Sequence, residues 1–232
     1  MEMAAETLAC LDSQIAKNHL LLHPFYRAWT AGRLPGLALV DYARQYYHHV
    51  AAFPMYLSAL HSHTEDPTTR RHILSNLTDE EAGHPNHPEL WLQFAEALGV
   101  TREEMASAQP WPETRQLVGT FRSICREESV AAGLAALYAY ESQIPKIAEA
   151  KLDGLRRFYG LTSPQAVEYF EVHIEADREH SRIERQLLAR WIDPTTVSDV
   201  FASAGAVLDR LWDFLFAVGR RYVVCETLRS PS

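Results

Sequence analysis

Apolar residues recur at helical spacing along almost the whole chain of 232 residues. In the segment from Val197 to Tyr222, for example, the apolar residues at helical spacing are Leu208, Leu211, Trp212, Leu215 and Phe216. No segment alternates Val, Ile and Thr with polar residues between hairpin turns. The pattern therefore predicts an all-α fold, in which this C-terminal segment either covers the core or forms a dimer face.

Glycine and proline divide the helical pattern into about seven or eight main helices. The breaks lie at Pro24, Gly32 to Gly36, Asp66-Pro67, Gly83 to Pro88, Gly99, Pro110 to Pro112, Gly160 to Pro164 and Asp193-Pro194. Thr101 and Glu104 have the spacing of a capping box, and Ser163 precedes Pro164 as a helix N-cap does. No repeat or linker interrupts residues 5–225, so we expect one compact domain over residues 1–232.

Composition limits the partners of the chain. A formal net charge of −8 is unfavourable for binding nucleic acid, whose phosphates attract clustered Lys and Arg. No run of about 18 apolar residues is present to span a membrane, and the N-terminal MEMAAETLACLDSQ does not have the pattern of an export signal. Cys10, Cys125 and Cys225 form neither a disulfide framework nor a metal knuckle. We expect a soluble, cytoplasmic protein that acts on a small molecule or a protein.

The segment His173-Ile-Glu-Ala-Asp177-Arg-Glu-His180 predicts half of a metal site. Positions i, i+4 and i+7 lie along one face of a helix, so two imidazoles and one carboxylate can converge on one ion. Nitrogen and oxygen ligands together suit iron, manganese or zinc. Because charged residues surround this segment, an exposed helix face is the alternative interpretation.

Two further segments offer ligands for a second ion. Glu80 and His87 are seven residues apart and share a face if one helix continues through both, with a kink caused by the glycine and prolines between them. Glu141 ends an apolar helix that begins at Ala131, where a lone acid is unfavourable unless it is paired or bound to a metal. The alternatives are a solvated acidic patch for Glu80 and His87, and pairing with Lys146 or Arg157 for Glu141.

These segments follow the ligand order of the haem-oxygenase-like diiron oxidases: Glu, six residues, His; then an isolated Glu; then His-x3-Asp-x2-His. The chain resembles that family at Glu80, His87, Glu141, His173, Asp177 and His180. The resemblance implies a haem-oxygenase-like helical bundle with two metal ions, Fe/Fe or Fe/Mn, that uses dioxygen and an external reductant. We expect one ion near Glu80, His87 and His180 and the other near His173 and Asp177, with Glu141 bridging.

A closer resemblance, over roughly residues 10 to 190, is to the family of the chlamydial protein associating with death domains. It rests on segments such as HPFYRAWTAGRL, NLTDEEAGHPNHPELWLQFAEALGV and YFEVHIEADREHSRIE. It implies a single-turnover oxygenase that makes 4-aminobenzoate for folate synthesis from its own residues. Tyr26, in the motif His-Pro-Phe-Tyr, corresponds to the ring donor and Lys151 to the amino donor, and the family's further pocket tyrosines correspond to Tyr42, Tyr140 and Tyr169.

Other interpretations stay open at this point. The region after about residue 190 departs from the closer family and has no terminal cysteine cluster, so we do not expect death-domain binding. A weaker likeness to pyrroloquinoline-quinone synthase C proteins and TenA-type thiaminases leaves an enzyme that acts on an exogenous small ring compound. A helical protein-interaction module is the third interpretation, and a homodimer is compatible with all three. Tyr26 has a plain interpretation as a core residue, and Lys151 as a solvated helix residue.

Overall fold

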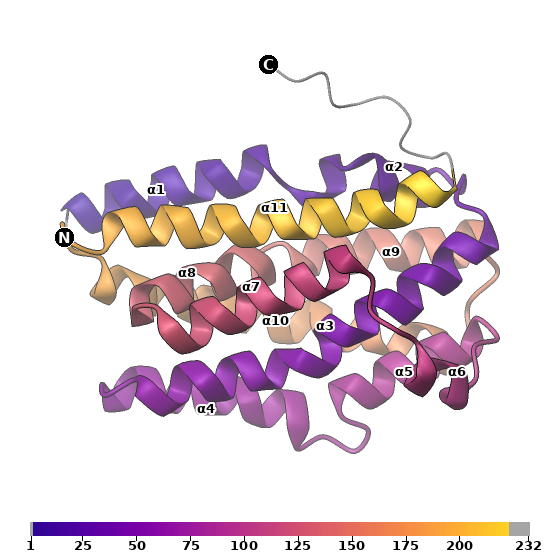
Figure 1. The fold of residues 1–232 in the computed structure, drawn as a ribbon, viewed down its shortest axis with the longest axis horizontal. Coiled ribbons are helices and arrows are strands. Elements are labelled where there is room, and N and C mark those ends of the chain that lie inside the picture. The colour runs from indigo at the N-terminus through magenta and orange to yellow at the C-terminus, as the bar shows by residue number, and fades with distance from the viewer. Residues whose placement is uncertain (1, 223–232) are drawn as a thin grey trace.

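Eleven α-helices and one short 3-10 helix make up residues 2–222, the part of the chain that the computed structural model describes (Figure 1). Their bounds are α1 Glu2–Lys17, η1 Leu20–Leu22, α2 Pro24–Thr30, α3 Gly36–His63, α4 Pro67–Glu81, α5 His87–Ala97, α6 Arg102–Ser107, α7 Pro112–Glu127, α8 Val130–Glu141, α9 Ile144–Phe158, α10 Pro164–Trp191 and α11 Val197–Arg221. These residues contain no β-strand, which confirms the all-α prediction.

Helix α8 lies in the centre of the bundle and is apolar on every side. Every residue from Ala131 to Glu141 is buried, and the helix packs against α7, α10 and α11. A glycine at position 133 lets α3 come close, because a Cβ atom there would lie 2.6 Å from Leu60 Cδ1. A helix that is apolar all round is stable only inside a core. Its last residue, Glu141, is therefore carried into the interior.

Helix α11 covers one side of the core. Leu208, Leu211, Leu215 and Phe216 are all buried in the chain itself, and α11 packs against α7 and α8 on one side and α1 on another. Figure 1 shows α1 and α11 running side by side along one edge of the molecule. The predicted apolar face of this segment therefore serves the core, and no dimer is needed to bury it.

Most of the predicted breaks coincide with helix ends. Thr101 and Glu104 form the expected capping box, and Gly160, with φ of 66°, follows the end of α9. Two further breaks, at the two ends of α8, are marked by none of those glycines and prolines, but they agree with the apolar helix expected from Ala131 to Glu141. One is the Ser129 cap of α8, whose side chain accepts a hydrogen bond from the Ala132 N–H. The helices are therefore more numerous than the seven or eight expected, because polar caps as well as Gly and Pro end them.

The predicted break at Gly83 to Pro88 is confirmed, so Glu80 and His87 do not share the single kinked helix that the sequence analysis considered. Helix α4 ends at Glu81, residues 82–86 form a turn, and α5 begins at His87. Asn86 is the N-cap of α5, and its Oδ1 accepts a hydrogen bond from the Glu89 N–H at 2.9 Å. The glycine and prolines of this segment end one helix and start another. Glu80 and His87 consequently approach each other from two helices.

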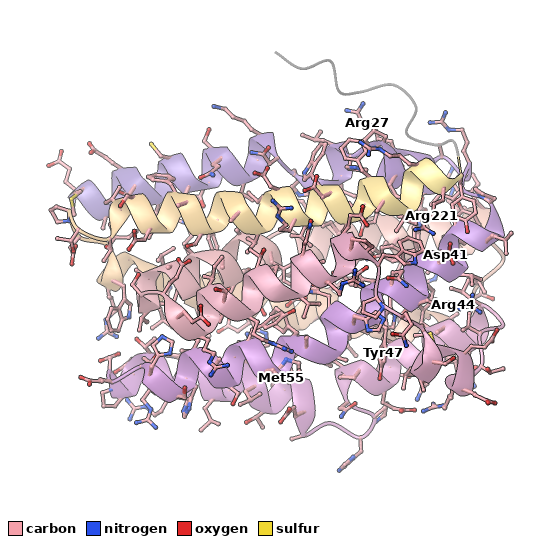
Figure 2. All side chains as sticks on the ribbon, in the orientation of Figure 1. Arg27, Asp41, Arg44, Tyr47, Met55 and Arg221 are labelled. Carbon is pink, nitrogen blue, oxygen red and sulfur yellow. The ribbon has the colours of Figure 1, made fainter. Side chains whose placement is uncertain are left out.

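The C-terminal end of α11 is held to its neighbours by contacts at the surface. Tyr222 donates a hydrogen bond to Asp41 Oδ2 at 2.7 Å, and the Arg221 guanidinium lies 3.4 Å from the centroid of the Trp111 ring. Figure 2 shows Arg221 and Asp41 near each other where α11 ends beside α3. These contacts fix the end of α11 against α3 and the segment that precedes α7.

The remaining expectations from composition have different outcomes. Among residues 2–222, no helix is long and apolar enough to cross a membrane. Cys10 is exposed, Cys125 is buried, and both are free thiols. Cys225 lies outside the described residues.

Candidate metal centre

Four helices bring all six of the predicted ligand residues into the middle of the bundle. Helix α10 contributes three residues, and the ends of α4, α5 and α8 contribute one each. Five of the six side chains are buried, and the sixth, on α10, is half-buried; the six are Glu80, His87, Glu141, His173, Asp177 and His180. The alternatives of an exposed helix face and a solvated acidic patch are therefore wrong for the buried five.

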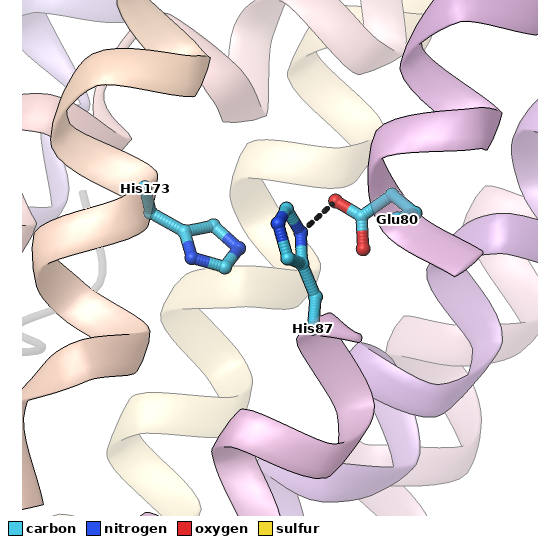
Figure 3. Close-up of side chains that lie close together, drawn as sticks. All are labelled: Glu80, His87 and His173. Carbon is cyan, nitrogen blue, oxygen red and sulfur yellow. Dashed lines mark ion pairs between the residues drawn. The ribbon is translucent and has the colours of Figure 1, made fainter. Parts of the chain in front are cut away.

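The first group consists of Glu80, His87 and His173. Each offers one ligand atom, and these three atoms lie within 4.8 Å of one another. Figure 3 shows the His87 ring between the Glu80 carboxylate and the His173 ring, with His87 Nδ1 3.0 Å from Glu80 Oε1. His173 Nδ1 lies 2.6 Å from the backbone oxygen of Tyr169. That contact fixes the orientation of the His173 ring and leaves Nε2 for an ion, as is usual for metal-binding histidines.

The second group consists of Glu141, Asp177 and His180, whose ligand atoms also lie within 4.8 Å of one another. Asn76 Nδ2 donates a hydrogen bond to Glu141 Oε1 at 3.0 Å. His180 Nε2 lies 3.0 Å from Asp79 Oδ2. The grouping differs from the expected one, because His173 rather than His180 joins Glu80 and His87. Helix α5 packs against α10. Its first residue, His87, lies beside the turn of α10 that carries His173 and not beside the turn that carries His180.

Electrostatics fit this centre to cations. Asp177 Oδ2 and Glu141 Oε2 are buried and have no hydrogen-bond partner among the described residues. Burial, with the nearby carboxylates of Glu141 and Glu80, raises the pKa of Asp177 well above its ordinary value. Glu80 and Glu141 also stand in the last turns of α4 and α8, where the helix dipole disfavours negative charge. Bound cations would compensate the unpartnered carboxylate oxygens, the burial and mutual repulsion of the carboxylates, and the unfavourable helix dipoles.

The donor set narrows the choice of ion. Three imidazoles and three carboxylates suit iron, manganese or zinc, whereas calcium and magnesium favour oxygen donors alone. The two groups of residues are close enough that Asp177 interacts with both Glu80 and Glu141. The residues present therefore fit a centre of two first-row metal ions.

Beside the metal-ligand groups lies a buried chain of hydroxyl groups and one amine. Lys151 Nζ donates a hydrogen bond to Tyr42 Oη at 2.7 Å, and the Tyr42 and Tyr26 hydroxyls are 3.0 Å apart. Lys151 is only 4% exposed and Tyr26 2%. The interpretation of Lys151 as a solvated residue is wrong. The chain joins the two residues that the resemblance marks as ring and amino donors.

The two other tyrosines of the resemblance lie between this chain and the ligand groups. The Tyr169 ring packs on the His173 ring with centroids 4.0 Å apart. The hydroxyls of Tyr140 and Tyr46 are 2.6 Å apart. Both tyrosines line a cavity of about 10 Å³ that Lys151 and His173 also border. This small cavity therefore joins the amine to the first ligand group.

Burial sets the protonation of the cluster. Desolvation lowers the pKa of Lys151 from 10.5 to about 7, because aromatic rings surround the amine and no carboxylate compensates its charge. Burial also raises the pKa of Tyr26 well above 10.0. At neutral pH a large fraction of Lys151 is thus a neutral amine, which is the nucleophilic form, while Tyr26 is a neutral phenol.

Four residues of the site were missed by the sequence analysis. Asn76 and Asp79 hold two of the ligands, as described above, and the Tyr46 hydroxyl contacts that of Tyr140. Glu184 is buried, and burial, together with the nearby carboxyl group of Glu141, raises its pKa well above the ordinary value. Glu184 follows His180 by one helical turn, so its spacing on α10 was the available signal. Asn76 and Asp79 gave no comparable signal, because only the packing of α4 against α3, α5 and α10 turns them toward this site.

Comparisons with known proteins support this description. The pattern of a family described as iron-containing redox enzymes, with the haem-oxygenase fold, matches residues 40–212. The chain belongs to this family. It is therefore an enzyme of the dinuclear-metal oxygenase class.

Within that class, two curated relatives cover almost the whole chain. A 4-aminobenzoate synthase of Nitrosomonas europaea is 44% identical over 229 residues, 93% of each protein. A 4-aminobenzoate synthase of Chlamydia pneumoniae is 45% identical over 205 residues, 88% of this chain and 91% of the relative. A TenA homologue from Pseudomonas syringae has the same fold, with a TM-score of 0.81 at 16% identity over 94% of this chain and 93% of its own. Pyrroloquinoline-quinone synthases and a CADD-like protein of Nostoc punctiforme are also similar. The resemblance that the sequence analysis stated is confirmed.

Proposed function

We propose that this protein makes 4-aminobenzoate for folate biosynthesis, and that it takes the ring from its own Tyr26 and the amino group from its own Lys151. The ligands would be the two groups Glu80, His87, His173 and Glu141, Asp177, His180. Iron, or iron with manganese, would supply electrons to dioxygen when bound, which redox-inactive zinc does not do. Each chain would react once.

The chemistry follows from comparing tyrosine with the product. 4-Aminobenzoate is a tyrosine ring in which Cβ has become the carboxylate carbon and an amine has replaced the phenol hydroxyl. Its formation breaks the Cα–Cβ and ring C–O bonds of Tyr26 and the Nζ–Cε bond of Lys151, and it forms the ring C–N bond and the two carboxylate C–O bonds at Cβ. The carboxylate oxygens come from dioxygen or water, and the severed Cα and Cε stay in the protein, where each takes up hydrogen or oxygen. Dioxygen is the oxidant, an external reductant supplies the remaining electrons, and the phenol oxygen leaves as water.

The observation that carries the proposal is the buried hydrogen-bonded chain from Lys151 through Tyr42 to Tyr26. The distance from Lys151 Nζ to Tyr42 Oη is 2.7 Å, and the Tyr42 and Tyr26 hydroxyls are 3.0 Å apart. This chain places an amine with a pKa of about 7 near a phenol that is covalently part of the protein. Covalent attachment gives both reactants a fixed position without any binding energy from a free substrate. Tyr42 positions both groups, and Tyr140 and Tyr169 separate them from water.

An exogenous ring substrate is less well supported. The cavity between the tyrosines and His173 has a volume of about 10 Å³, which is room for about one water molecule. A benzoate-sized molecule would require the packed aromatic side chains to move apart. A role limited to protein interaction gives no reason for six clustered metal-binding side chains, five of them buried, and death-domain binding is no part of the proposal.

The surroundings of the reaction are also proposals. A cytoplasmic location suits the unpaired cysteines and the need for a reductant. One domain over residues 1–232 suits the way α11 and α1 pack on the core. A homodimer remains a prediction.

The experiment that tests the proposal uses protein labelled with ring-¹³C tyrosine and ¹⁵N-lysine. The metal-free protein receives Fe²⁺ and Mn²⁺, a reductant and air, with no organic substrate. We expect labelled 4-aminobenzoate carrying both isotopes, in a yield of at most one per chain. Intact-protein mass would fall correspondingly, with the losses mapped to Tyr26 and Lys151.

The matched controls are Tyr26→Phe, which removes the phenol, and Tyr47→Phe, a half-buried tyrosine on α3 outside the cluster. Tyr26→Phe should give no product, whereas Tyr47→Phe should give the yield of the unchanged protein. An unchanged mass and no product, in protein that binds two ions and consumes dioxygen, would contradict the proposal and favour an external substrate.

A further inference from the structure

Five of the six candidate ligands are buried, so metal ions need a route to them. Glu141 is 1% exposed and Asp177 4%, whereas the His180 side chain is 11% exposed. A divalent ion does not cross packed apolar side chains, because it would lose its hydration without compensation. The route should therefore offer oxygen or nitrogen donors from the surface inward, and it should end near His180.

A cavity of about 100 Å³ meets this description. It opens between α4, α8 and α10, with His180 in its wall. Its wall combines apolar residues, among them Leu134 and Leu137, with polar residues from α4 and α10, which are His72, Ser75, Asn76, Asp79, Glu179 and Glu184. It has room for several water molecules.

The outer end of the cavity carries an exposed carboxylate. The Asp79 side chain is 53% exposed, and its Oδ2 lies 3.0 Å from His180 Nε2. A negative group at the mouth of a cavity with apolar walls raises the local concentration of cations. His180 already bonds to that group, so an ion captured at Asp79 arrives beside the first of the buried ligands.

The inner end of the cavity carries a buried carboxyl group that has no assigned role. Glu184 is 6% exposed, and its Oε2 is buried without a hydrogen-bond partner among the described residues. Its carboxyl group lies close enough to that of Glu141, a member of the second ligand group, to interact with it electrostatically. Oxygen donors therefore follow one another from Asp79 through Glu184 to Glu141.

A second hollow approaches the centre from the turn between α4 and α5. It has a volume of about 650 Å³ and reaches His87. Its wall includes the donors Asp79, His84 and Glu168, none of which is buried, and His87 is its single buried metal-binding residue. His87 Nδ1 faces Glu80. No buried carboxylate in this wall leads inward from the surface donors as Glu184 does in the first cavity, so the first cavity is the better route.

We propose that the cavity between α4, α8 and α10 is the route by which divalent first-row metal ions enter the buried centre, with Asp79 as the capturing residue and Glu184 as the transfer residue. This inference rests on the proposed function for the existence of the centre. It concerns the rate of loading, and the ligands that hold the ions at equilibrium stay the same.

Three single substitutions on α4 separate the two approaches. Ser75 is exposed and lines the proposed route, so Ser75→Trp plugs its mouth without removing a charge. Thr78→Trp plugs the other hollow. Leu74→Trp is the matched control, because Leu74 is 47% exposed and lines neither cavity. The measurement is the rate at which metal-free protein takes up Mn²⁺ in the absence of oxygen. It is followed by the loss of the electron paramagnetic resonance signal of free Mn²⁺.

We expect Ser75→Trp to slow uptake at least tenfold while two ions per chain are still bound at equilibrium. Thr78→Trp and Leu74→Trp should load at the rate of the unchanged protein. The inference is overturned if Ser75→Trp loads at that same rate, or if Thr78→Trp slows loading equally. If the unchanged protein binds no Mn²⁺, Fe²⁺ or Co²⁺ at all, the proposed metal centre itself fails, and that result is distinct from a wrong route.

Discussion

At the scale of single residues, the molecule places polar groups where solvent cannot reach them. Lys151, Asp177 and Glu184 are each at most 6% exposed, and no basic side chain makes an ion pair with these carboxylates among residues 2–222. Such groups lower stability unless something binds them. Their presence inside one bundle indicates that the interior is arranged for chemistry at some cost in stability.

The buried amine makes stability depend on pH. Lys151 has a pKa of about 7 in the folded protein and an ordinary value of 10.5. Between these values the unfolded chain binds a proton that the folded chain does not, so the free energy of unfolding rises with pH. Lys151→Met removes this dependence. The stability gained by Lys151→Met should therefore shrink by about 2 kcal/mol from pH 7 to pH 9, given about 1.4 kcal/mol per pH unit at most.

Urea denaturation of metal-free protein at pH 7, 8 and 9 measures this difference. Comparing the variant with the unchanged protein cancels other groups that titrate in the same range, such as the Cys125 thiol, whose pKa is raised by burial from an ordinary value of 9.0. Lys146→Met, on the exposed side of the same helix, should show a constant difference. Parallel curves for Lys151→Met would mean that the amine is charged in the folded protein.

At the scale of elements, helix ends determine the metal centre. Glu80, His87 and Glu141 stand at the end of α4, the start of α5 and the end of α8. The caps that set these ends therefore also set the positions of the ligands. The position of a ligand at a helix end changes when the helix starts or ends one residue earlier or later. The spacing of His173 and Asp177 within α10 is instead fixed by the helix itself.

The N-cap of α5 gives a test at this scale. Asn86→Ala removes the hydrogen bond from the Glu89 N–H to Asn86 Oδ1 and should lower the free energy of unfolding by about 1 kcal/mol. Because α5 starts at His87, the variant should also weaken metal binding at the first ligand group about tenfold. Chelator competition measures the affinity and urea denaturation the stability.

Thr101→Ala is the control, because Thr101 caps α6 and α6 carries no ligand. It should cost similar stability and leave metal affinity unchanged. Equal losses of affinity in the two variants would show that general destabilisation, and not the position of His87, weakens the site.

At the scale of the whole molecule, metal binding and stability should be coupled. Ions that bind only the folded protein, each at 100 times its dissociation constant, add about 2.7 kcal/mol apiece. For a chain of this size two ions should raise the midpoint of thermal unfolding by about 10 °C or more. Differential scanning calorimetry with and without Mn²⁺ checks this expectation.

Asp177→Asn should raise the unfolding temperature of the metal-free protein and reduce the further rise that Mn²⁺ gives. It relieves the burial and the carboxylate repulsion that raise the Asp177 pKa, so the metal-free variant should unfold at a higher temperature than the unchanged protein. It should also lose most of the rise on adding Mn²⁺. Asp153→Asn, at an exposed ion pair with Arg157, should keep that rise. A full rise in Asp177→Asn would remove Asp177 from the ligand set.

The sequence by itself determined the helical class, most helix boundaries and the six candidate ligands. Helical periodicity, caps and i, i+4, i+7 spacing are local properties, so the printed residues suffice to read them. The tertiary structure decided what depends on packing between distant segments. It decided that Glu80 and His87 meet from two helices, that His173 joins them, and that Asn76, Asp79 and Glu184 surround the second group. It also decided that Lys151 is buried against Tyr42, because hydrogen bonds across 109 positions of the chain have no signature in sequence spacing.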